Sequence, residues 1–149
     1  MKKDKKKHKM QDGGAKKMLA RIETAVSNEF YLEAAWLLSS VIEKKLKRML
    51  EKIDGPVPSS GYSLEQSVKR VKHLHVTARH PLFTEHYPVG LIDEIRNWKN
   101  QRNTILKDMQ DVHVSQARQE RLAMEGIRLL QEWNKAKRKF KAGVNSQAD

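Results

Sequence analysis

Apolar residues recur three or four positions apart through most of this chain, and this spacing is the feature that most restricts its fold. Such spacing places them on one face of an α-helix, and no stretch alternates long enough to predict a sheet. Prolines at 56, 58, 81 and 88 divide the pattern into blocks. We therefore expect an all-α, up-and-down bundle of about five helices. The expected helices span residues 15–30, 31–53, 63–78, 89–111 and 115–141.

The two ends of the chain lack this periodicity. Residues 1–14 hold six lysines and two aspartates and end in Gly13-Gly14, so we expect a flexible, disordered basic arm. A helical-bundle domain is expected over residues 15–142, and residues 143–149 are expected to fray as a tail. The helix expected over residues 63–78 should begin with a capping box, in which the side chains of Ser63 and Gln66 each bond the backbone N–H of the other residue.

The charge balance points to an acidic partner. Thirty Lys and Arg face eighteen Asp and Glu, a net charge of +12 with a pI near 10.0, and nucleic acid is the leading candidate. The absence of cysteine excludes disulfides and thiolate chemistry. No apolar run is long enough for a membrane span or a secretory signal, so we expect a cytoplasmic protein. Histidine spacing and the lack of phosphate-loop motifs predict no metal and no cofactor.

The most informative block is the fourth expected helix, because a charge interrupts its apolar stripe. The stripe positions are Leu91, Ile95, Trp98, Arg102, Ile105 and Met109. A guanidinium cannot be deprotonated, so an arginine on such a stripe requires a partner. Three arrangements would supply one: an internal carboxylate such as Glu43, a cleft that admits a phosphate, or a subunit interface. Trp36, Trp98 and Trp133 are all expected in the core.

Three segments resemble the HEPN superfamily of small helical-bundle proteins. They are YLEAAWLLSSVIEKKL at 31–46, SLEQSVKRVK at 63–72 and IRNWKNQRN at 95–103. The family signature is an arginine, usually followed by a polar residue, with a histidine four to six intervening residues later on the same helix. Arg102 and Asn103 match the signature, whereas Lys107 stands in the histidine position and no histidine follows until His113.

The resemblance implies a homodimer whose paired helices line a cleft, which in many members cuts RNA without a metal. By this resemblance Arg102, Asn103 and Lys107 are the catalytic positions of a degenerate motif, in which the arginine steadies the charge on the phosphate. Lys107 can hold a phosphate but makes a poor general base, because lysine stays cationic near neutrality. We therefore expect an RNA-associated binding protein with a degenerate, weak or inactive ribonuclease cleft. By resemblance alone, a nucleotidyltransferase-like antitoxin is a possible partner.

Two other functions stay open at this point. One is an active metal-independent endoribonuclease of toxin or defence type, with Lys107 as the base. The other is a helical protein-interaction module in which Arg102 pairs internally. The residues expected to contact nucleic acid are Arg102, Lys107, Lys99, Lys44, Lys47 and Arg48.

Overall fold

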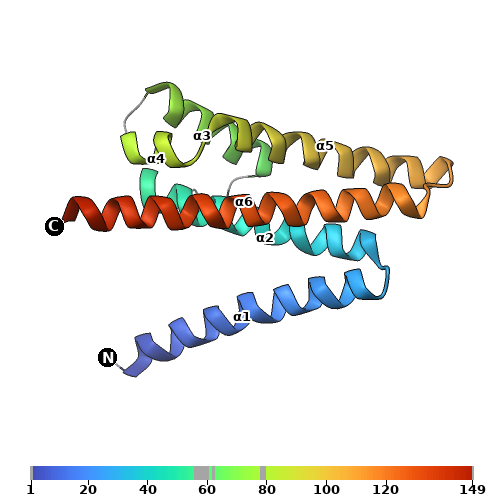
Figure 1. Cartoon of the computed structure of the whole chain (residues 1–149), viewed down its shortest axis with the longest axis horizontal. Helices are drawn as coiled ribbons and strands as arrows, with labels where there is room; N and C mark the ends of the chain where they lie inside the picture. The colour runs from blue at the N-terminus through green and yellow to red at the C-terminus, as the bar shows by residue number, and fades with distance from the viewer. Residues whose placement is uncertain (1, 56–60, 62, 78–79, 149) are drawn as a thin grey trace.

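A computed structural model describes residues 2–55, 61, 63–77 and 80–148. These residues form six α-helices and no strand (Figure 1), which confirms the all-α class. The helices are α1 (Lys2–Ser27), α2 (Tyr31–Asp54), α3 (Leu64–Thr77), α4 (Pro81–His86), α5 (Val89–Asp111) and α6 (Gln116–Ala148). No helix in this part of the chain combines the length and apolar character that a bilayer crossing requires.

The helices differ from the expected ones in three places. A sixth helix, α4, forms between two prolines, because Pro81 occupies a first-turn position, where a missing N–H costs nothing. The backbone of residues 2–14 is helical, in contrast to the expected flexible arm, because lysine favours helices and each glycine costs only about 1 kcal/mol. Helix α6 continues to Ala148 through the segment expected to fray from residue 143.

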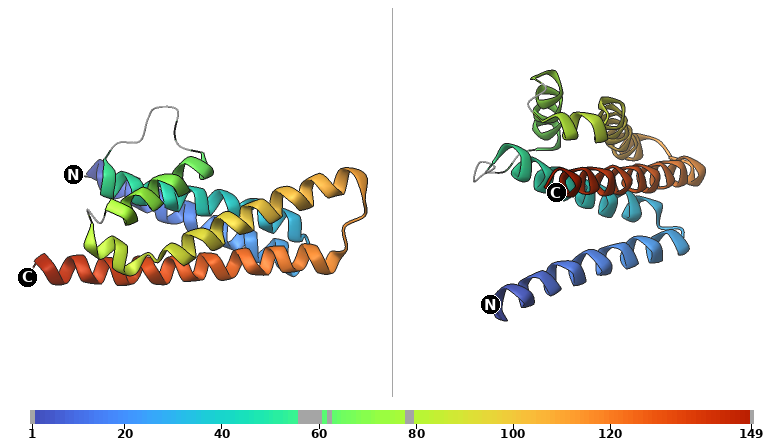
Figure 2. Two further views of the ribbon diagram at one scale, coloured as in Figure 1. Left: turned by 90° about the horizontal axis from the view of Figure 1, so that it is seen from above. Right: turned by 60° about the vertical axis from the view of Figure 1, so that its left-hand side comes forward.

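Two long helices form the centre of the molecule. Helices α2 and α6 lie side by side and run in the same direction (Figures 1 and 2). Helix α5 packs on α6, α1 packs on α2, and α3 and α4 cover one end. Helix α1 diverges from α2 toward its own N-terminus (Figure 1). Among the residues of α1 whose side chains the structure describes, Ile22 and Ala25 are buried.

A close contact in the core joins α5 to α6. The Trp98 side chain is 1% exposed, and its indole N–H donates to the Leu122 carbonyl oxygen at 2.8 Å. The ring lies directly against Gly126, where an added Cβ would be 2.6 Å from Trp98 Cζ2. A glycine at this position therefore allows α5 and α6 to approach closely.

The end covered by α3 and α4 is fixed by a cap and by a histidine. The expected capping box forms: the Ser63 N–H donates to Gln66 Oε1 at 2.9 Å, and the Gln66 N–H donates to Ser63 Oγ at 3.1 Å. The His75 ring bonds the carbonyl oxygens of Val71 and Tyr87, which ties α3 to the start of α5. Ring contacts continue from Phe83 to Tyr87 and on to α6.

The Tyr87 side chain gives a testable pH dependence. Burial raises the pKa of Tyr87 from 10.0 to about 12, so the neutral phenol stabilises the fold fully below pH 10, and this contribution is lost as the pH rises through 12. In Tyr87→Phe, the free energy of unfolding should fall less steeply between pH 10 and 12 than in the parent. Urea unfolding at pH 8, 10 and 11.5 measures this; parallel curves for the two proteins would contradict it.

Candidate nucleic-acid interface

The apolar stripe of α5 is buried on both sides of the interrupting arginine. Leu91, Ile95, Trp98 and Ile105 are at most 7% exposed. Arg102 lies among them and is partly buried, and Met109 beyond it is 44% exposed. The guanidinium therefore interrupts a stripe that is buried as far as Ile105 and becomes exposed at Met109.

Neutral groups surround the Arg102 guanidinium. Nη1 donates to the Ser39 hydroxyl of α2, and Nη2 donates to the Asn103 side-chain oxygen at 3.3 Å. Nε is buried and has no hydrogen-bond partner. The expected pair with Glu43 does not form, because Ser39, one turn earlier on α2, occupies the position facing Arg102 and Glu43 is exposed. Across the described residues, no carboxylate lies within 4.0 Å of this guanidinium.

Two other arginines near α5 are paired with carboxylates. Arg128 bonds Glu125 at 2.5 Å and Glu94 at 3.3 Å, and its hydrogen bonds lower the pKa of the Glu125 carboxyl. Arg118 bonds Asp108 at 3.0 Å. A partly buried cation without a carboxylate is costly, so the Arg102 site lacks the counter-charge that these two arginines have.

An exposed tryptophan lies against the same guanidinium. The Trp36 side chain is 63% exposed, and Arg102 Cζ is 5.6 Å from its ring centroid. The prediction that Trp36 belongs to the core is wrong, whereas Trp98 and Trp133 are buried. The sequence holds a signal for this: the residues four and seven positions after Trp36 are Ser40 and Glu43, which places the indole on a polar face of α2.

The other expected residues of α5 divide into two groups. Asn103 contacts Arg102 directly, and Lys99 lies one turn before Arg102 on the same side of α5 and is partly buried. Lys107 is exposed and is displaced by about 140° around the helix from Arg102, given 100° per residue. The helix is continuous through Asp111, and His113 follows in the loop. Neither Lys107 nor His113 therefore shares the face of Arg102.

The expected cations of α2 do not converge on this face either. Arg48 is nine residues from Ser39 and lies on the opposite side of α2, about 180° away. Lys44 lies about 140° away, and Lys47, at about 80°, is the nearest of the three in angle. All three are exposed. The site that the structure assembles consists of Trp36, Ser39, Lys99, Arg102 and Asn103.

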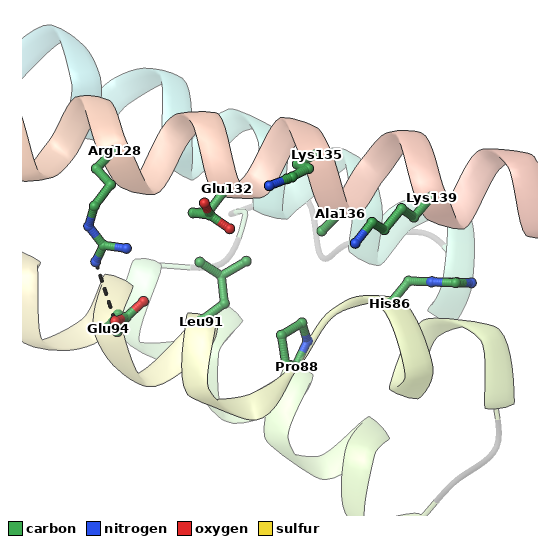
Figure 3. Close-up of a pocket in the computed structure, with 9 residues that line it drawn as sticks. All are labelled: His86, Pro88, Leu91, Glu94, Arg128, Glu132, Lys135, Ala136 and Lys139. Carbon is green, nitrogen blue, oxygen red and sulfur yellow. Dashed lines mark ion pairs between the residues drawn. The ribbon is translucent and has the colours of Figure 1, made fainter.

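Two cavities lie elsewhere on α6. One, of about 220 Å³, lies among α4, α5 and α6, where Lys135 and Lys139 extend over it and Glu132 stands beside Lys135 (Figure 3). Its Arg128 is paired with Glu94. The other is an open groove between α5 and α6 that holds Arg118, Arg121 and Arg128. Both sites mix cations with acids, and in the described part of the chain no three histidine or acidic side chains are placed to hold a metal ion.

The site around Arg102 thus offers a cation without a counter-charge, a hydroxyl, an amide and an exposed aromatic ring. These groups suit a phosphate next to an unsaturated ring. The described side chains of this face include no histidine and no carboxylate. Comparisons with models of known protein families, with curated proteins and with solved structures find no match for this chain.

Proposed function

We propose that this chain binds single-stranded RNA at the face formed by Trp36, Ser39, Lys99, Arg102 and Asn103, and that it cleaves RNA weakly or not at all. The observation that carries the proposal is the Arg102 guanidinium, partly buried without a carboxylate and in contact with an exposed indole. The net charge of +12 favours a polyanion. The resemblance of this helix to the HEPN superfamily favours RNA.

Each component of the site has a part in binding. The Arg102 guanidinium would bind a phosphate, which would supply the counter-charge that it lacks. Asn103 and Lys99 flank the position that this phosphate would occupy. The ring of Trp36 would stack with an unpaired base, an interaction of about 1–3 kcal/mol. A base in a duplex cannot reach the indole in this way, so the site would select single strands.

Cleavage requires a group that takes a proton from the 2′-hydroxyl. The side chains that contact Arg102 are a serine, an asparagine and a tryptophan, and Lys107 points to another side of α5. General acid–base catalysis contributes about 10²–10⁴ in rate. RNA incubated with the protein in EDTA should therefore stay intact or be cut only slowly, and rapid accumulation of cyclic-phosphate ends would contradict this part of the proposal.

Intrinsic fluorescence tests binding at Trp36, because Trp98 and Trp133 are 1% and 2% exposed and are shielded from a ligand. Adding a ten-nucleotide single-stranded RNA should quench the exposed indole, and the matching RNA duplex should not. Trp36→Ala should abolish the quenching and weaken binding about 5- to 150-fold, the equivalent of one lost stacking contact.

Phe30→Ala is the matched control, since Phe30 is an aromatic residue 59% exposed at the turn between α1 and α2. Its affinity should equal that of the parent. An equal loss in both variants, or no quenching in the parent, would overturn the proposed site.

A further inference from the structure

The net charge of the molecule is concentrated in three short segments. Residues 1–17, 44–54 and 135–149 hold eighteen Lys and Arg against five Asp and Glu, a surplus of thirteen. All other residues together hold twelve Lys and Arg against thirteen Asp and Glu. The whole positive charge therefore belongs to segments that are far apart in the sequence.

The fold brings these segments to one end of the molecule. Helices α2 and α6 are packed together and parallel, so their C-terminal halves lie side by side, and the N-terminal half of α1 ends on the same side (Figure 1). We call the cations of the α2 and α6 segments the basic pole. They are Lys44, Lys45, Lys47, Arg48, Lys52, Lys135, Lys137, Arg138, Lys139 and Lys141.

At the centre of the basic pole, cations of α2 and α6 lie near one another. Lys45 of α2 is partly buried, and burial, followed by the charges of Lys137 and Arg48, lowers its pKa. Arg48 and Lys52 continue the row along α2 at helical spacing, and Lys141 follows Lys137 by one turn on α6. The α2 row spans about 10 Å at 1.5 Å per residue.

Helix dipoles do not account for this arrangement. Their effect is confined to the last turn of a helix, and the last turn of α6 contains no basic residue, because α6 continues to Ala148. On α2 the last turn contains Lys52 alone. Folding therefore brings these like charges together for a reason other than the helix dipoles.

We propose that the basic pole binds the phosphate backbone of double-stranded RNA without reading its bases. This surface is separate from the site around Arg102, because Arg48 lies on the side of α2 opposite Ser39. Duplex nucleic acid carries one charge per about 1.7 Å of axis, which matches a dense block of helical cations. Among the described residues of the two segments, none is an exposed aromatic, and Val144 is the one exposed large apolar side chain. A duplex backbone therefore suits this surface better than a single strand or a membrane does.

The test measures binding of a duplex RNA across a salt series. Lys45→Gln, Arg48→Gln and Lys137→Gln are combined in one variant, and a second variant combines the exposed changes Lys52→Gln, Arg138→Gln and Lys141→Gln. The control combines Arg21→Gln, Lys69→Gln and Arg121→Gln, which are exposed and lie outside the three segments. Each pole variant should lower the slope of log affinity against log salt by about 2 to 3, and affinity at 100 mM salt at least tenfold.

The control should keep the parent slope, and Trp36→Ala should keep duplex binding. Equal losses in pole and control variants would overturn the inference, because they would reflect total charge rather than this surface. So would a parent protein that ignores duplex RNA at low salt while binding anionic vesicles or an acidic protein through the same lysines. The single-strand quenching at Trp36 tests the other site independently, so either proposal can fail alone.

Discussion

Replacing Gly126 with alanine should destabilise the protein by about 1–3 kcal/mol, although alanine is the better helix former. The new Cβ would lie 2.6 Å from Trp98 Cζ2, 3.0 Å from Trp98 Cε2 and 3.1 Å from Leu38 Cδ1. The indole cannot move away cheaply, because it is buried and its N–H is held by the Leu122 carbonyl. Helices α5 and α6 would therefore have to separate.

Gly90→Ala is the matched control on the partner helix. An added Cβ at Gly90 meets no atom within 4 Å, so this change should leave stability unchanged or raise it by up to about 1 kcal/mol. Thermal unfolding measures both variants, and for a chain of this size 1 kcal/mol shifts the melting temperature by about 2–4 °C. A more stable Gly126→Ala protein would show that the close packing of α5 on α6 is absent.

The long helices could be predicted because, in those segments, the capping residues and the apolar periodicity indicate the same helices that pack in the fold. The expected helix over residues 89–111 matches α5 at both ends, where Pro88 precedes the first turn and the extended backbone of Val112 ends the last one. The capping box at Ser63 is present as expected. Helix α4 was missed, because six residues between prolines carry too little periodicity to indicate a helix, and its stability comes from the contact of Phe83 with the core.

The candidate site was predictable in position and not in composition. The interruption of the apolar stripe located Arg102, since a charge at that register needs a partner whatever the fold. Which group of α2 faces it depends on how α2 and α5 are aligned, which the sequence does not contain. Glu43 was therefore one candidate beside a phosphate and a subunit interface, and Ser39 was not among them. Trp36 was predicted wrongly because large aromatic side chains usually lie in the core. Ser40 and Glu43, one and two turns later, indicate instead that it lies on a polar face of α2.

We propose that Arg102 contributes to RNA binding and not to the stability of the fold. A structural arginine would gain more stability from its contacts than its burial costs, so removing it would lower the free energy of unfolding. A binding arginine without a counter-charge costs stability, so an apolar side chain of similar length should be tolerated or favourable. Arg102→Met continues the apolar stripe of α5 and removes the buried, unbonded Nε.

The decisive measurement is therefore the stability and single-stranded RNA affinity of Arg102→Met, with Arg121→Met as the control for the loss of one charge. Arg121 is exposed, on the open groove between α5 and α6. We predict that Arg102→Met unfolds at the same or a higher temperature and binds RNA about 10- to 150-fold more weakly, the equivalent of one charge-assisted contact. The control should bind nearly as the parent does. A destabilised Arg102→Met protein that binds RNA as tightly as the parent would contradict the account.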